Sequence, residues 1–241
     1  MTIDLMLIVA KYFQTNSDYI NLMLVSSKYA KLVEFYRCNP ISDPRLFTAI
    51  ETQNFYVPED EQYRIEGMFR YVYWFRVDYD VFRYGRECDV YKDVELNASS
   101  DVKSLVDSNG HCSVPVGVTR IGCSCFKNMP ITKVSLPVGI KTIGNEAFRA
   151  TNIREVIVPT GVTELGDYVF SECWDLKKVS LPDTLIRIGA WCFCFLALPE
   201  LAVPASVQSV NESSFHDVNT LILPRHLACM ISTDRCGLVL I

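Results

Sequence analysis

Apolar residues recur along the second half of the chain with a period of 22 or 23 residues. Each repeat opens with a proline and places aliphatic residues three and six positions later. A glycine follows the second aliphatic, and a phenylalanine comes eleven positions after the proline. A shortened sixth opening follows at Pro224, Leu227 and Met230. Repeats one to five begin at Pro115, Pro137, Pro159, Pro182 and Pro204.

Each repeat closes on three aliphatic residues that lead into the next proline. The last two alternate with one variable residue, so both point to one face of a short strand, and that face belongs to the core. The proline ends the strand without leaving a ladder donor unpaired. The closing triplets are Ile131, Val134 and Leu136; Ile153, Val156 and Val158; Leu176, Val179 and Leu181; Leu198, Leu201 and Val203; and Val218, Leu221 and Leu223.

One position holds glycine in four repeats and asparagine in the fifth: Gly122, Gly144, Gly166, Gly189 and Asn211. Glycine and asparagine tolerate a positive φ better than other residues, so this column predicts a left-handed turn in every repeat. A single repeat buries too little apolar surface to offset its own ordering entropy. The repeats are therefore expected to stack into a solenoid whose strands form one continuous curved parallel sheet.

The repeat pattern resembles the BspA-like class of leucine-rich repeats over residues 113 to about 230. The resemblance rests on the IG-x-x-x-F core, on Cys173 in the segment SEC, and on the closing segment LKKVSLP. Such proteins occur in parasitic protists and some bacteria. The resemblance implies a β-rich leucine-rich-repeat solenoid over residues 113–241, so the fold class is α+β with an all-α N-terminal cap.

Residues 1–48 have helical periodicity. Leu5, Ile8, Val9, Tyr12 and Phe13 share one face, and a second stripe follows a helix cap at Asn16 or Ser17. We expect these helices to cover the apolar end of the solenoid. The segment from Leu5 to Leu32 also resembles an F-box, which joins substrate receptors to cullin ubiquitin ligases, but it lacks the Leu-Pro start and the late tryptophan. The second stripe is Leu22, Val25, Tyr29, Leu32 and Tyr36.

Residues 49–112 separate the helical region from the regular repeats. Three apolar segments, at 55–57, 71–77 and 94–96, lie about 20 residues apart. They predict strands of irregular repeats that continue the ladder of strands toward the cap.

The segment IGAWCFCF at 188–195 could be taken for a metal clip, because two thiols lie two residues apart. Cys192 shares a column with Cys125, Ala147, Val169 and Ser214, which predicts packing under the core. Cys194 aligns with polar residues and is expected to face solvent, where alkylation would reach it before Cys192. Zinc needs more ligands than this segment offers, and Cys123 with Cys125 fails in the same way. The column of Cys194 also holds Lys127, Arg149, Ser171 and His216.

The histidines His111, His216 and His226 lie in different columns, and none has a nucleophile at a motif spacing. We therefore expect no catalytic residues, no cofactor and no metal. The candidate site is instead a surface, formed by the residues that flank the core aliphatics of each closing strand. One column alternates lysine and glutamate, and the other exposes aliphatics, as expected of a protein-docking face. These residues are Lys133, Ser135, Glu155, Ile157, Lys178, Ser180, Glu200, Ala202, Thr220 and Ile222.

The chain has 23 Lys and Arg against 28 Asp and Glu, a net charge of −5. This balance argues against nucleic acid as the main partner and against a polybasic membrane anchor. Ten cysteines without a C-x-x-C motif, and an N-terminal segment without the charge of a signal peptide, predict a cytoplasmic protein. Three hypotheses stay open: a non-catalytic scaffold that binds a protein on the concave sheet, an F-box substrate receptor that also binds a ligase adaptor subunit, and a surface adhesin exported by a non-classical route.

Overall fold

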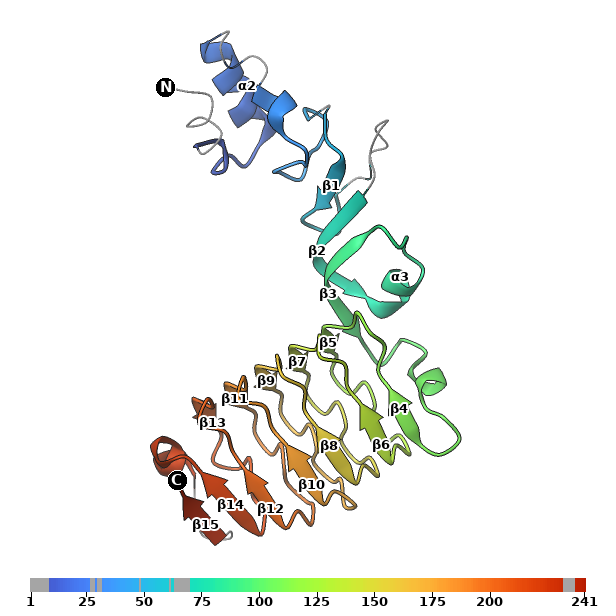
Figure 1. Cartoon of the computed structure of the whole chain (residues 1–241), viewed down its shortest axis with the longest axis vertical. Coiled ribbons are helices and arrows are strands. Elements are labelled where there is room, and N and C mark those ends of the chain that lie inside the picture. The colour runs from blue at the N-terminus through green and yellow to red at the C-terminus, as the bar shows by residue number, and fades with distance from the viewer. Residues whose placement is uncertain are drawn as a thin grey trace. The chain divides into compact units, whose positions relative to one another are not determined.

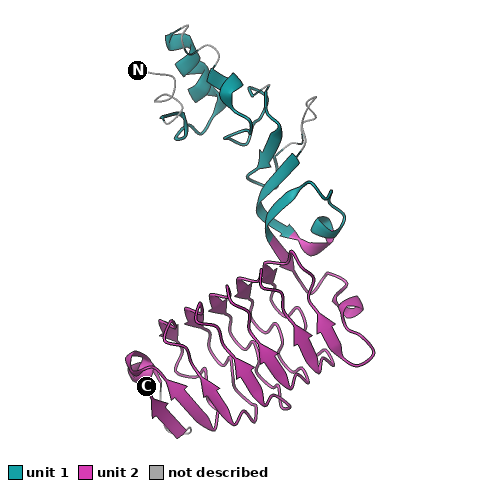
Figure 2. Ribbon diagram, in the orientation of Figure 1, with its two compact units in different colours: residues 1–77, 81–93 teal, residues 78–80, 94–241 magenta. Residues whose placement is uncertain are grey.

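The computed structural model describes residues 9–26, 29, 32–47, 49–60, 62, 70–231 and 237–241. The chain divides into two compact units, which Figure 2 shows in teal and magenta. The N-terminal unit comprises residues 1–77 and 81–93, and the solenoid unit comprises residues 78–80 and 94–241.

In its described residues the N-terminal unit contains the short helix α2, which is followed by strands. The helix α2 starts after Thr15, whose hydroxyl accepts the Asp18 backbone N–H while the Asp18 carboxylate accepts the Thr15 N–H. The helix cap is therefore Thr15 and not the predicted Asn16 or Ser17. The elements are α2 (Asn16–Val25), η2 (Leu32–Phe35), β1 (Thr52–Phe55), β2 (Arg70–Asp78), α3 (Tyr79–Arg83) and β3 (Val90–Leu96), of which β2, α3 and β3 span the boundary to the solenoid unit.

The helical region has a small aromatic core of its own. Tyr19 is fully buried, meets the rings of Phe13 and Phe47 edge to face at 5.0 and 5.1 Å, and donates its hydroxyl to the Ala10 carbonyl at 2.9 Å. Of the second predicted stripe, Leu32 is buried and Leu22, Tyr29 and Tyr36 pack against this core. Val25 is 76% exposed, so its assignment to the stripe was wrong. Leu5 and Ile8 of the first stripe lie outside the described residues.

Two buried asparagines connect the helical region to the first strand. The Asn39 side-chain amide donates to the carbonyls of Ile41 at 2.8 Å and Asn54 at 2.7 Å, and its oxygen accepts the Asn54 backbone N–H. The Asn54 side chain donates to the Asn39 carbonyl and accepts the Trp74 indole N–H at 3.0 Å. Strand β1 then pairs in parallel with β2, which neighbours β3. The segment at 55–57 was thus placed too late, because β1 ends at Phe55.

The solenoid unit has two parallel ladders rather than one (Figure 1). The predicted closing triplets form one side, in separate sheets of β4 with β6, β8 with β10, and β12 with β14 and β15. The opening aliphatics form the other side, where β3 pairs with β5 and the ladder continues to β13. The strands are β4 (His111–Ser113), β5 (Arg120–Ile121), β6 (Lys133–Ser135), β7 (Thr142–Ile143), β8 (Glu155–Ile157), β9 (Glu164–Leu165), β10 (Lys178–Ser180), β11 (Arg187–Ile188), β12 (Glu200–Ala202), β13 (Ser209–Val210), β14 (Thr220–Leu223) and β15 (Gly237–Leu240), with the 3-10 turns η3 (Val102–Leu105) and η4 (Arg225–Met230).

The repeat phenylalanines stack in a column inside the solenoid. Neighbouring rings are nearly parallel, with centroids 5.2, 5.7, 5.6 and 6.0 Å apart along the column. Their burial, with that of the aliphatics, makes a continuous core in which each repeat packs on its neighbours. The column consists of Phe126, Phe148, Phe170, Phe193 and Phe215.

The glycine column has a different cause from the predicted left-handed turn. None of its four glycines has a positive φ. A Cβ on Gly189 would lie 2.4 Å from the carbonyl carbon of Gly166, and one on Gly166 would lie 2.8 Å from that of Gly144. These glycines therefore allow backbone of successive repeats to approach closely. In the first four repeats the left-handed residues lie later in the turn, where inter-repeat hydrogen bonds hold non-glycine residues such as Glu146 and Tyr168 at positive φ.

Repeat five departs from this column in two linked positions. In the first four repeats the glycine N–H donates to a carbonyl of the preceding coil, as Gly189 donates to Leu165 at 2.9 Å. The Asn211 N–H instead donates to the hydroxyl of Ser214, which in turn donates to the Gly189 carbonyl at 2.8 Å. The Ser214 hydroxyl thus bridges the Asn211 N–H to the preceding coil, in place of the direct backbone hydrogen bond of the first four repeats. The last coil then leads into η4, where Leu227 is buried, whereas Met230 is 41% exposed and is not a core residue.

Candidate protein-binding face

All ten predicted docking residues lie on the closing strands β6, β8, β10, β12 and β14. The first and third residues of each strand point away from the core and the second points into it, as in Glu155–Ile157, where only Val156 is buried. Ile157 is 63% exposed, which is unusual for an isoleucine in the middle of a sheet. Thr220 and Ile222 are half-buried, and the other eight residues are exposed.

The alternating charges on this face form one ion pair. The Lys178 ammonium lies 2.8 Å from the Glu155 carboxylate, and this hydrogen bond raises the pKa of Lys178. Within the described part of the chain, Lys133 and Glu200 have no oppositely charged side chain within 4.0 Å. The predicted charge ladder is therefore limited to its middle pair. Because that pair is exposed, it contributes little to stability.

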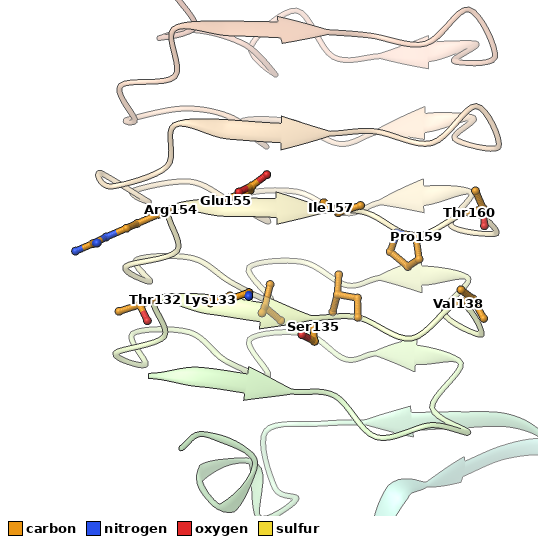
Figure 3. A pocket seen from close by; sticks show the side chains of 11 residues that line it. Thr132, Lys133, Ser135, Val138, Arg154, Glu155, Ile157, Pro159 and Thr160 are labelled. Carbon is orange, nitrogen blue, oxygen red and sulfur yellow. The ribbon is translucent and has the colours of Figure 1, made fainter. Parts of the chain in front are cut away.

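A groove of about 800 Å³ lies between β6 and β8 (Figure 3). It lies where the closing-strand ladder is interrupted, because β6 belongs to one sheet and β8 to another. Lys133 and Arg154 lie at the end of the groove where the strands begin, and Val138 and Pro159 lie at the opposite end. Ile157 and Ser135 lie between these ends. The groove therefore has a cationic end and an apolar end.

Sequence reasoning missed five of the groove residues and assigned Val134 and Leu136 to the core alone. The five missed residues are Thr132, Val138, Arg154, Pro159 and Thr160. Thr132 and Arg154 precede the strands, and Val138 and Pro159 follow them, so the outward alternation of a strand did not include these residues. Val138 is 78% exposed in a variable position after a proline. An aliphatic residue in such a solvent-facing column was the available signal.

The two thiols of the fourth repeat are both fully buried. Cys192 packs as predicted, and its burial raises the pKa of the thiol. The prediction that Cys194 faces solvent was wrong. Its thiol donates to the Ser213 carbonyl at 2.9 Å, and burial raises its pKa to about 11. Strand alternation does not extend into this turn, because Trp191 and Phe195 both have a positive φ.

The other residues in the column of Cys194 are not uniformly exposed either. Lys127, Arg149 and His216 are half-buried, and Ser171 is fully buried. Arg149 bridges the carboxylates of Glu146 and Glu172, so this column carries an ion-pair network between repeats.

The histidines make separate local contacts. His111 Nε2 lies 2.8 Å from the Ser135 hydroxyl, His216 Nδ1 lies 3.3 Å from the Asp217 carboxylate, and His226 Nε2 lies 2.8 Å from the Val207 carbonyl. In the described ranges, no group of three or more His, Cys, Asp or Glu side chains is arranged to hold a metal ion. Over the same residues, no helix has the length and apolar character needed to cross a membrane.

Three solved structures are similar to this chain. The pneumococcal vaccine antigen PcpA is 22% identical with a TM-score of 0.44, over 46% of this chain and 29% of its own. The T. pallidum leucine-rich-repeat protein TpLRR is 23% identical with a TM-score of 0.45, over 47% and 58%. A leucine-rich-repeat protein from Bacteroides ovatus is 18% identical with a TM-score of 0.47, over 85% and 50%. The chain spans less than two thirds of each of these structures, and comparison with curated proteins gives no match.

Residues 107–222 match the BspA type leucine-rich-repeat region in six copies. This match begins before the five repeats that open at prolines, in agreement with β4, which supplies a further closing strand with Cys112 buried. The period, the stacked coils and the match agree that residues 107–222 are BspA-type leucine-rich repeats.

Proposed function

We propose that this protein is a non-catalytic scaffold that binds a protein partner across the outer face of the closing strands β6, β8, β10, β12 and β14. The observation that carries the proposal is the groove between β6 and β8, with exposed Ile157 at its centre and cations at one end. Leucine-rich-repeat proteins typically bind other proteins rather than catalyse reactions, which supports this function.

The chemistry of the groove favours an extended acidic and aliphatic segment of the partner. Lys133 and Arg154 have no ion-pair partner among the described residues, whereas Glu155 is neutralised by Lys178. A carboxylate of the partner can therefore pair at the cationic end, and aliphatic side chains can cover Val138 and Ile157. Burial of apolar area supplies affinity, and the charges set the orientation.

The test is affinity capture from native lysate, analysed by mass spectrometry, with the full chain as bait. A double variant, Ile157→Asp with Lys178→Glu, places a charge in the groove and reverses the middle cation of the face. We expect loss of the captured partner with an unchanged circular dichroism spectrum.

A matched control carries the same two types of substitution on the other ladder. Ile186→Asp with Lys141→Glu alters exposed residues beside β11 and β7, and this variant should retain the partner. Capture that survives the groove variant would show that the partner docks elsewhere.

The F-box-type function is a second proposal, supported by the exposed apolar surface of α2. Leu24 and Val25 are 78% and 76% exposed, and Ile20 is 41% exposed. An apolar helix surface of this kind suits the docking of a ligase adaptor subunit. Leu24→Lys with Val25→Lys should abolish co-purification of a cullin-ligase adaptor. A preparation of the unmodified chain that never contains such an adaptor would argue against this function.

A further inference from the structure

The repeats differ in the length of one turn, and these differences meet at one side of the solenoid. The first closing aliphatic follows the repeat phenylalanine by six positions in repeat three, by five in repeat four and by three in repeat five. The extra residue in repeat three lies in the segment Trp174-Asp175, and repeat five is two residues shorter than repeat four at this turn. A long turn therefore lies next to a regular one, which is followed by a short one.

A hollow of about 510 Å³ lies where these three turns adjoin. Repeat three contributes Trp174, repeat four contributes Phe195 to Ala197, and repeat five contributes His216, Asp217 and Asn219. Trp174 is 64% exposed and Phe195 is 40% exposed. The stepped turn lengths thus leave two aromatic side chains uncovered beside a cavity of the size of small-ligand sites.

The Phe195 side of the hollow is held in place by its neighbours. The Phe195 backbone N–H donates to the Asp217 carboxylate at 2.8 Å. The Phe195 ring stacks on Trp191 with centroids 6.1 Å apart and an interplanar angle of 5°, and Trp191 contacts His216 at 5.8 Å. A site that is already ordered loses little entropy when a ligand binds.

The polar groups at the hollow carry both signs of charge and a neutral amide. The lining includes the Asp217 carboxylate and the exposed Asn219 amide, and the Lys177 ammonium lies 3.5 Å from the carbonyl of the lining residue Ala197. A cationic ligand would meet Lys177 and an anionic ligand would meet Asp217. A neutral ligand with several hydroxyls can donate to the carboxylate and accept from the ammonium and amide.

We propose that this hollow binds a neutral saccharide, with one sugar ring against Trp174 and Phe195 and its hydroxyls on Asp217, Asn219 and Lys177. A pyranose has an apolar C–H face that matches an aromatic ring and a hydroxyl rim that both donates and accepts hydrogen bonds. The site lies on the turns that lead into the closing strands, so it adjoins the proposed protein-binding face but shares no lining residue with the groove between β6 and β8.

The experiment is a titration of the full chain with cellotriose, chitotriose and maltotriose, followed by isothermal calorimetry and by acrylamide quenching of tryptophan fluorescence. At least one trisaccharide should bind with a dissociation constant below about 10 mM, which corresponds to a weak binding free energy. Bound sugar should reduce the quenching of the exposed Trp174. Trp174→Ala should lower the affinity at least about tenfold, and Asn219→Ala should lower it several-fold.

Tyr84→Ala is the matched control, because Tyr84 is an 81% exposed aromatic residue of the N-terminal unit. This variant should bind as the unmodified chain does. The proposal fails if none of the three trisaccharides binds, or if Trp174→Ala binds a trisaccharide with unchanged affinity. Saturable binding of tetramethylammonium that competes with the sugars would also overturn it, because the hollow would then select a cation.

Discussion

The two units of this chain are stabilised in contrasting ways. In the solenoid unit each type of contact recurs in several repeats, as with the five stacked phenylalanines and the four close-packed glycines. In the helical part of the N-terminal unit the main contacts occur once, as with the buried Asn39–Asn54 network and the aromatic core around Tyr19. Because its contacts recur, the solenoid unit can be predicted from its sequence, and its turns can vary in length. Because its main contacts are unique, the N-terminal unit is sensitive to single substitutions.

Asn39→Ala should give the largest effect and should confine it to the N-terminal unit. The substitution leaves the Asn54 N–H and two carbonyls without their buried partner, and each such group costs about 1 to 3 kcal/mol. We expect a total loss of about 4 kcal/mol. Hydrogen exchange measured by mass spectrometry should show faster exchange in residues 9–60 and unchanged exchange in residues 115–223. Equal acceleration in both regions would contradict the contrast between the units.

Gly189→Ala should destabilise the solenoid, because Gly189 belongs to the glycine column where backbone of successive coils lies in close contact. The new Cβ would lie 2.4 Å from backbone of the preceding coil, so the coils must separate locally at a cost of about 2 to 3 kcal/mol. Thermal unfolding followed by circular dichroism measures this loss. Gly139→Ala is the control, since its Cβ would lie 3.6 Å from the nearest atom and should change stability by less than about 1 kcal/mol. Similar losses in the two variants would refute the close-approach explanation.

Glu146→Gln should have the smallest effect on stability, and the size of this effect should depend on pH. Hydrogen bonds from Lys127 and Arg149 lower the pKa of Glu146 from 4.5 to about 2. A folded-state pKa below the unfolded value means that the ionised group stabilises the fold above pH 4.5, and that this contribution disappears as the pH falls to about 2. Because the side chain is partly exposed, we expect about 1 to 2 kcal/mol.

Urea unfolding at several pH values measures this contribution. The unmodified chain should lose more stability than the Gln variant between pH 4.5 and about 2. Parallel curves for the two proteins would show that the ion-pair network between repeats does not couple to folding.

The regular part of the fold followed from the sequence because one pattern was repeated in register. The closing strands β6, β8, β10, β12 and β14 and the buried phenylalanines lie where the period places them. The second ladder was missed in the regular repeats because β5, β7, β9, β11 and β13 have only two residues each, too few to show an alternation. The glycine column was recognised but misinterpreted, since a sequence does not distinguish a positive φ from a close approach between coils.

The candidate protein-binding face could be predicted only in part from the sequence, for a similar reason. The alternation of side chains along a strand correctly predicted that Lys178 and Ile157 are exposed. It did not extend to turns, so it missed Arg154 and Val138 in the groove and misplaced Cys194. Contacts between turns depend on the relative lengths of neighbouring repeats. An alignment of the repeats by column hides these differences in length.

The 3-10 turn η4 limits self-association at one edge of the solenoid. Strand β13 is the last strand of the eight-stranded sheet, and an uncovered parallel edge would be a template for strands of other molecules. The turn η4 follows β14 and packs against β13, with His226 Nε2 at 2.8 Å from the Val207 carbonyl and Leu227 buried in the core. This turn therefore covers the edge strand, which protects this side of the solenoid from aggregation.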